Sequence, residues 1–342
     1  PVNWPESTEA EIAAIPTRTV VVGNNQKFQF SDNTVKTSKY TLWDFLPKFL
    51  LEEFDPHTKI ANLYFLMIAC LQCIPAISNT NGLPTFLAPL TVVVAIDASF
   101  QAIEDYHRHV ADHIANETPA LVYQNEKQQD NTHFKSVARS TILVGDIIKI
   151  ENRNEIPADC IILSCYEKVE PAQGLCFVET KQLDGETNLK SRSALPNTLS
   201  TIRTEDSLHV LKGSIDMEHP NNLIDSFNGV INLDKNNFFT IDGPGAYKDK
   251  QVINSANILL RGCVLRNCNY VYGLVVNTGH DTKIMMNSRG AQPKVSQLQA
   301  NASKEIERII GMLLTFCVIG ATGQTIWNSS NKINEIWYLA AD

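Results

Sequence analysis

Residues 183–190 contain the side chains in this sequence best suited to chemistry on a bound water molecule. Glu186 places a carboxylate directly after Gly185, and Asp184 and Thr187 flank this pair. Carboxylates are ionised at neutral pH and can accept a proton from an attacking water. The spacing therefore predicts a Gly-containing turn that holds one water molecule against an electrophile. The plain alternative is an ordinary polar surface turn.

Short β-rich runs surround this loop and would have to position it. The runs richest in branched and aromatic residues lie at 120–123, 147–150, 160–163, 175–178, 257–260 and 270–276. Many short strands with Gly and Pro turns favour a compact β-sandwich or jelly-roll-like module. A polar stretch at 191–245 interrupts the pattern, and residues 236–241 within it predict an inserted strand.

Charge is distributed unevenly along the 342 residues. Residues 60–96 and 309–331 contain no Asp, Glu, Lys, Arg or His. A membrane-spanning helix needs about 20 mostly apolar residues. The first run therefore fits two short spans, near 62–77 and 85–103, joined by the turn-forming residues 78–84, and the second run fits one span. The alternative is a set of buried helices in a large soluble core.

Basic residues flank the expected hairpin and are missing from its loop. Lys48 and Lys59 precede the first span, and Arg108 follows the second. Because Lys and Arg are enriched on the cytoplasmic side of membranes, both outer ends of the hairpin are expected to face the cytosol. Residues 104–308 would then be cytosolic, and the third span would carry the chain outward again.

The residues before the first span also follow a pattern. Apolar residues of 43–54 recur three and four apart, which predicts an amphipathic helix in the membrane interface with Trp43 as an anchor. Residues 1–16 are expected to be disordered or loosely attached. Four segments follow from this interpretation, namely a cytosolic amino-terminal part with the interfacial helix at 1–59, a transmembrane hairpin at 60–103, a cytosolic stalk and β-rich domain at 104–308, and a third span with the start of an outer loop at 309–342.

Composition excludes several other classes of protein. A formal net charge of -8 argues against a nucleic-acid-binding surface, which should be basic. Eight cysteines in a chain of this length do not form a disulfide scaffold. Cys70 and Cys73 have the spacing of a redox or zinc pair, but they lie in an apolar run without a second pair or a nearby His or acidic ligand. No metal site is therefore expected in this chain.

Several stretches, in one continuous order from about residue 17 to the end, resemble the type IV P-type ATPases, the phospholipid-flippase branch. The loop at 184–187 spells Asp-Gly-Glu-Thr and is followed by Asn-Leu-Lys, as in that branch. Residues 144–159 resemble the core of its actuator domain, with Asp side chains that can cap free backbone N–H groups. Further similar stretches lie at 37–40, 45–47, 61–66, 104–109, 260–267 and 278–283.

The resemblance implies the amino-terminal part of a pump, comprising the first three membrane spans and the actuator domain. Such a pump uses ATP and Mg²⁺ to phosphorylate its own aspartate, and hydrolyses the aspartyl phosphate while a phospholipid crosses to the cytosolic leaflet. In that cycle Glu186 would orient or deprotonate the attacking water. Gly185 would let the backbone approach the phosphoryl group closely, and Asp184 and Thr187 would shape the loop.

Three parts of the family pattern are missing from the sequence. It contains no Asp-Lys-Thr-Gly-Thr phosphorylation loop, no nucleotide-binding domain, and no Gly-Asp-Gly hinge for magnesium. No Walker-type Gly-rich loop replaces them. The chain alone is therefore expected neither to hydrolyse ATP nor to bind ATP or Mg²⁺, both of which the full-length protein would require.

Candidates for contact with the lipid lie in the first span. Many aminophospholipid flippases have two adjacent glutamines near its outer end, and this chain has Gln72 and Cys73. Gln72 can touch a lipid headgroup or make an interhelical hydrogen bond, and the sequence leaves both open. Asn62, at the start of the span, is a third candidate. Asp97 lies near the cytosolic end of the second span, where it is expected to reach the headgroup region.

Two alternatives remain open. One is a non-enzymatic membrane protein that uses the actuator fold for regulation or partner binding. The other is a cation-transporting P-type ATPase, but that branch usually spells the loop Thr-Gly-Glu-Ser, so residues 184–190 favour lipid. The resemblance also implies a membrane phospholipid as substrate, a small glycosylated two-span accessory subunit, and a eukaryotic plasma membrane or endomembrane with the actuator domain cytosolic.

Overall fold

The computed structural model describes most of the chain. The described residues are 17–23, 30–56, 58–78, 80–126, 132–167, 174–202, 204–233, 250–288 and 297–330. The chain separates into two compact units, each formed from two segments. The first comprises Pro1–Thr37 and His109–Ala291, and the second comprises Ser38–Arg108 and Gln292–Asp342.

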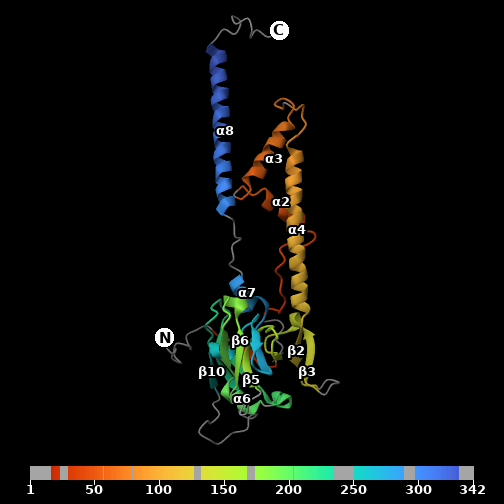
Figure 1. Ribbon diagram of the computed structural model, residues 1–342, viewed down its shortest axis with the longest axis vertical. Coiled ribbons are helices and arrows are strands. Elements are labelled where there is room, and N and C mark those ends of the chain that lie inside the picture. Colours follow the sequence, from red (N-terminus) through yellow and green to blue (C-terminus); the bar gives the residue numbers. More distant parts are fainter. Residues whose placement is uncertain are drawn as a thin grey trace, which may run out of the picture. The chain divides into compact units, whose positions relative to one another are not determined.

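The described part of the first unit contains three antiparallel sheets (Figure 1). The six-stranded sheet has the order β11-β5-β13-β4-β2-β3, the four-stranded sheet β1-β8-β9-β10, and the three-stranded sheet β12-β6-β7. The strands of the six-stranded sheet are β2 (Pro119–Tyr123), β3 (Phe134–Ala138), β4 (Ile147–Glu151), β5 (Asp159–Tyr166), β11 (Ile258–Leu259) and β13 (Tyr270–Asn277). The strands of the other two sheets are β1 (Thr17–Val21), β8 (Gly213–Glu218), β9 (Gly229–Leu233), β10 (Lys250–Ile253), β6 (Leu175–Glu179), β7 (Leu189–Ser193) and β12 (Val264–Arg266).

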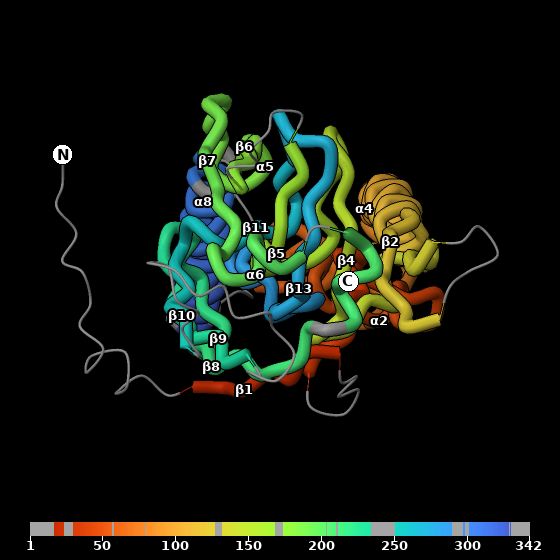
Figure 2. The backbone as a smooth tube through the Cα atoms, turned by 90° about the horizontal axis from the view of Figure 1, so that it is seen from below, coloured from red at the N-terminus to blue at the C-terminus, as the bar shows by residue number. Residues whose placement is uncertain are grey.

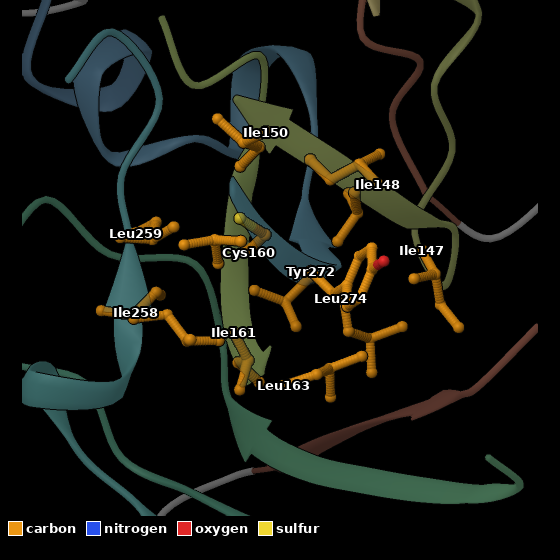
Figure 3. Close-up of a cluster of buried hydrophobic side chains, with 14 of the residues drawn as sticks. Ile147, Ile148, Ile150, Cys160, Ile161, Leu163, Ile258, Leu259, Tyr272 and Leu274 are labelled. Atoms are coloured by element: carbon orange, nitrogen blue, oxygen red, sulfur yellow. The ribbon is translucent and has the colours of Figure 1, made fainter. Parts of the chain in front are cut away.

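Strands β5 and β13 form the centre of the core, and they pair with one another along most of their length. Both are buried along nearly their whole length, which explains why apolar residues follow one another without alternation at 160–163 and 274–276. Figure 3 shows side chains of β4, β5, β11 and β13 gathered there, among them Ile148, Ile161 and Leu274. Burial of such side chains contributes about 25 cal/mol per Å² of apolar surface and is the main stabilising term. The predicted β-rich domain is confirmed.

Short helical segments connect the strands of this unit. They are η1 (Arg139–Thr141), α5 (Lys181–Asp184), α6 (Pro196–Thr201), η2 (Glu205–Val210), η4 (Ser255–Asn257), η5 (Gly279–Asp281) and α7 (Lys283–Ser288).

A buried polar cluster around Asp159 fastens several of these segments together. The Asp159 carboxylate is fully buried and accepts hydrogen bonds from the backbone N–H groups of Arg261 at 2.8 Å and Lys283 at 3.0 Å. The guanidinium of Arg261 donates to Asn33 at 2.9 Å, and the Asn33 amide donates to the carbonyl of Pro157 at 3.1 Å. Burial raises the pKa of Asp159, although these N–H donors oppose the shift. The predicted capping by Asp side chains is thus present.

The second unit contains helices α2 (Phe45–Glu53), α3 (Ile60–Gln72) and most of α4 (Leu87–Glu117), together with α8 (Gln297–Ser330). Among the described residues, α4 and α8 are long and apolar enough to cross a membrane. Almost none of their apolar stretches is buried within the protein. Helices in the core of a soluble protein would be mostly buried, so the soluble-core alternative does not fit.

Helix α3 is shorter than the sequence predicted. The expected span runs to residue 77, but the helix ends at Gln72 after 13 residues. Pro75 explains this end, because proline lacks an N–H group and disfavours helical conformation in the residue before it. Asn81 and Gly82, both with positive φ, lie in the predicted turn that follows. The prediction of one regular helix over 62–77 is therefore wrong at its carboxyl end.

The predicted amphipathic helix is present as α2. Phe49 and Glu53 on one face are buried within the second unit, whereas Leu46 and Leu51 are exposed. Trp43, just before the helix, is 92% exposed. This distribution leaves apolar side chains available for a membrane surface. Two further expectations, disorder or loose attachment at 1–16 and an inserted strand at 236–241, lie outside the described residues.

Candidate functional site

The loop with the candidate catalytic residues connects β6 to β7. These strands pair antiparallel with Glu179 opposite Leu189, so the loop closes a hairpin (Figure 2). Helix α5 makes one turn and ends at Asp184, and the next residue, Gly185, has a left-handed φ of 76°. No atom lies within 4 Å of the place where a Cβ on Gly185 would stand, so the backbone conformation alone calls for glycine.

The Asp184 carboxylate is the centre of the hydrogen bonds in this loop. It accepts from the hydroxyl of buried Thr180 at 2.9 and 3.0 Å, from the backbone N–H of Glu186 at 2.8 Å, and from Lys190 Nζ at 2.7 Å. Desolvation on its own would raise the pKa of Asp184, but the hydrogen bonds from Lys190, Glu186 and Thr180 outweigh it and lower the pKa. Asp184 therefore stays ionised and fixes the backbone that carries Glu186.

Glu186 presents its carboxylate at the tip of this turn. Its side chain is 57% exposed, and one carboxylate oxygen lies 3.3 Å from Lys190 Nζ. Thr187 is exposed beside it. The structure thus brings Asp184, Gly185, Glu186 and Thr187 together in one exposed turn. Such an arrangement can accept a proton from a water molecule held between Glu186 and an incoming electrophile.

Two residues that border the loop were not among the site residues predicted from the sequence. Thr180 and Lys190 both hydrogen-bond to Asp184, and Lys190 also pairs with Glu186. For Thr180 the spacing contains a usable signal, since it precedes Asp184 by four residues at the helical turn of α5. Pairs four apart meet in helical turns. Hydrogen bonds to Asp184 and Glu186 raise the pKa of Lys190, with the Asp184 bond contributing most, so its ammonium group stays charged.

Gln72, for which the sequence left a headgroup contact or an interhelical hydrogen bond open, hydrogen-bonds to the residues just before α4. Its side-chain nitrogen donates to the Thr85 hydroxyl at 3.0 Å, and its side-chain oxygen accepts from the backbone N–H of Phe86 at 3.2 Å. These bonds join the end of α3 to the residues that lead into α4. Next to it, the Cys73 thiol donates to the Ala69 carbonyl at 3.4 Å.

Asn62 lies at the opposite end of α3 and belongs to a different cluster. Its amide donates to Glu53 at 2.7 Å, and Lys59 pairs with Glu53 and, at 2.9 Å, with Asp97. Burial alone would lower the pKa of Lys59, but hydrogen bonds to these two carboxylates outweigh it and raise the pKa. Ten residues of helix separate Asn62 from Gln72, a rise of about 15 Å. The structure therefore does not bring the three lipid candidates into one site.

No group of three or more His, Cys, Asp or Glu side chains is placed to hold a metal ion within the part of the chain that the structure describes. Cys70 and Cys73 are both free thiols.

A β-rich domain with an Asp-Gly-Glu-Thr turn, together with the two long apolar helices among the described residues, agrees with what the resemblance to P-type ATPases implies. The family model described as phospholipid-translocating ATPase N-terminal matches residues 19–86. The resemblance to the type IV branch is thereby confirmed, and the chain is related along most of its length to phospholipid-transporting ATPases.

Three relatives illustrate this. The human probable phospholipid-transporting ATPase IM is 37% identical over 306 residues, which is 89% of this chain and 23% of that protein. The human phospholipid-transporting ATPase ID is 38% identical over 318 residues, 93% of this chain and 24% of that protein. The mouse phospholipid-transporting ATPase FetA is 35% identical over 309 residues, 90% of this chain and 24% of that protein. The chain spans about a quarter of the length of these relatives.

Proposed function

We propose that this chain supplies membrane spans and the actuator domain of an ATP-driven, phospholipid-translocating P-type ATPase. The observation that carries the proposal is the exposed Glu186 carboxylate on a turn that Asp184 braces. The relatives are phospholipid-transporting ATPases by name, which supports lipid over cation as the substrate class. The aspartate that accepts phosphate, and the sites for ATP and Mg²⁺, belong in this proposal to sequence other than these 342 residues.

In the proposed step, Glu186 acts on the water that hydrolyses an aspartyl phosphate. The water oxygen attacks phosphorus, and its proton passes to the Glu186 carboxylate. The bond between phosphorus and the aspartate oxygen breaks, with its electron pair left on that oxygen. The products are inorganic phosphate, a free aspartate carboxylate and a protonated Glu186, which then returns its proton to solvent. Asp184, Gly185 and Thr187 hold the turn in shape.

The remaining parts of the proposal concern the membrane. Helices α3 and α4, with the residues that join them, would form the transmembrane hairpin, and α8 would be the third span. Helix α2 would lie in the cytosolic interface, and the β-rich unit would be cytosolic. A phospholipid is the substrate, a two-span accessory subunit is a partner, and the location is a eukaryotic plasma membrane or endomembrane. For Gln72 and Asn62 the contacts favour helix packing over headgroup binding, because both side-chain amides are engaged within the protein.

The test is Glu186→Gln in the complete gene product, phosphorylated with radiolabelled ATP and then chased with unlabelled ATP. We expect the phosphoenzyme to form normally and to persist, because glutamine cannot accept the proton of the water. Decay of the phosphoenzyme at the wild-type rate would remove the assignment. Reading the coding sequence beyond Asp342 for Asp-Lys-Thr-Gly-Thr is the cheaper first check.

A further inference from the structure

Lys190 is the second residue of β7, where its backbone pairs with Val178 of β6. From this strand its side chain extends back to the turn. Its ammonium group lies 2.7 Å from an Asp184 oxygen and 3.3 Å from a Glu186 oxygen. The lysine side chain is 25% exposed, less than half the value of Glu186. A cation on a paired strand thus contacts both carboxylates at the tip of the hairpin.

We propose that Lys190 is a positioning residue for the hydrolysis of the aspartyl phosphate, holding the Glu186 carboxylate on the Asp184-braced turn in the place from which it acts on water. This inference rests on the proposed function. It assigns Lys190 no contact with the phosphoryl group. Lys190 acts through Glu186.

Geometry supports this role, because Glu186 has little else to orient its side chain. The backbone of Glu186 is fixed by its N–H bond to Asp184, but its side chain is more than half exposed. An exposed glutamate samples several rotamers, and holding one of them costs side-chain entropy. The ammonium of Lys190 offsets that cost with a charge-assisted contact, and its second bond to Asp184 keeps the ammonium in place.

Charge supports it as well. Asp184 and Glu186 lie two residues apart and both carry negative charge, so they repel each other without a cation between them. An approaching phosphoryl group adds further negative charge. With Lys190 in place the three side chains carry a net charge of -1, and without it they carry -2. Loss of the ammonium would therefore drive the Glu186 carboxylate away from Asp184 and from the phosphate.

The experiment measures decay of the phosphoenzyme in the complete protein, by the same radiolabelled chase. The variants are Lys190→Gln, which removes the charge, and Lys190→Arg, which keeps it. Lys181→Gln is the matched control, since Lys181 is an exposed lysine of α5 whose side chain forms no ion pair with any other residue that the structure describes. We expect decay to slow about 10- to 100-fold in Lys190→Gln, the size of effect that a misplaced catalytic group produces.

The arginine variant should decay within a few-fold of wild type, and the Lys181 control at the wild-type rate. All variants should form phosphoenzyme to the wild-type level, which shows that they fold. Lys190→Met, which retains most of the aliphatic stem, replaces the glutamine variant if that variant forms no phosphoenzyme. Wild-type decay in the neutral Lys190 variant, or equal slowing in Lys190→Arg, would overturn the inference.

A double variant separates positioning from a general structural role. If Lys190 acts through Glu186, then Glu186→Gln with Lys190→Gln should decay no more slowly than Glu186→Gln alone. Additive slowing would contradict the inference. Failure of the proposed function is recognised separately, because Glu186→Gln alone would then decay normally. Trapping by Glu186→Gln with normal decay in the neutral Lys190 variant would leave the proposed function standing and remove only the role of Lys190.

Discussion

Asp159 and Asp184 are the same residue type in the same unit, and each accepts hydrogen bonds from backbone N–H groups. Asp159 is fully buried in the core and receives two of them from distant segments, at Arg261 and Lys283. Asp184 lies in a surface turn and receives one from Glu186 and a charged bond from Lys190. Burial raises the pKa of Asp159, whereas the contacts of Asp184 lower its pKa.

The difference shows that an aspartate can stabilise the core in one place and fix the geometry of a candidate site in another. In the core, desolvation opposes the charged form, and the value of Asp159 lies in satisfying N–H groups that water cannot reach. In the turn, a partly exposed ion pair adds little to global stability and instead fixes local geometry. We therefore expect changes at Asp159 to affect stability and changes at Asp184 to affect hydrolysis.

Replacement of Asp159 by Ala should have the largest effect on stability. It leaves buried N–H groups of Arg261 and Lys283 without an acceptor, and we expect a loss of about 3–5 kcal/mol in the free energy of unfolding. Protease resistance of the β-rich unit in increasing urea measures this. Asp225→Ala, at an exposed position, is the control and should stay within about 0.5 kcal/mol of wild type. A loss at Asp159 no larger than at Asp225 would break the comparison.

Two glycines sharpen the contrast between core and turn. A Cβ on Gly273 in β13 would lie 2.7 Å from the sulfur of Cys160, so Gly273→Ala should destabilise the fold by about 1–3 kcal/mol through overpacking. Gly185 has open space but a positive φ, so Gly185→Ala should strain the turn by about 1–2 kcal/mol. Unfolding in urea should detect the destabilisation by Gly273→Ala. A change in the rate of phosphoenzyme decay should detect the strained turn of Gly185→Ala. If the phosphoenzyme decayed slowly in Gly273→Ala and normally in Gly185→Ala, the assignment of Gly273 to the core and Gly185 to the catalytic turn would be contradicted.

The smallest expected effect is on the dependence of stability on pH. Because the folded pKa of Asp159 is raised, its contribution to stability falls as pH rises from the unfolded value of about 3.9 through the folded value. The folded pKa of Asp184 is lowered, so its contribution is present above about 3.9 and is lost as pH falls through the folded value. We will compare the free energy of unfolding of wild type with that of Asp159→Asn and of Asp184→Asn across pH. The difference from wild type should change with pH in opposite directions for the two variants. Equal slopes would contradict this prediction.

Much of the local structure could be predicted from the sequence. The β-rich runs at 147–150 and 270–276 became β4 and β13, because branched side chains in a short apolar run fit a buried strand. The order of the strands could not be predicted. Leu274 of β13 lies between Ile147 of β4 and Ile161 of β5, more than 100 residues earlier, and such pairing depends on shape and register across the whole core.

The same limit applies to the candidate site. The order Asp184, Gly185, Glu186, Thr187 identified the turn, because glycine and short polar side chains are local signals. The contacts of Lys190 depend on the hairpin that returns β7 beside β6, which no local signal specifies. At the end of α3, Pro75 was a local signal for the end of the helix. The prediction instead followed the length of the apolar run and extended the span to residue 77.

Strand β1 has a consequence for biosynthesis. Thr17 pairs with Glu218 of β8, and Asn33 hydrogen-bonds to Arg261, so the first unit contains residues translated both before and after α3 and α4. At a translation rate of about 5–20 residues per second, β1 waits roughly 10 to 40 seconds before β8 leaves the ribosome. During that interval its N–H and C=O groups lack their partner strand. The apolar helices α3 and α4 are therefore synthesised while the edge of β1 is still unpaired. Chaperones or an incorrect strand can bind this edge during that time.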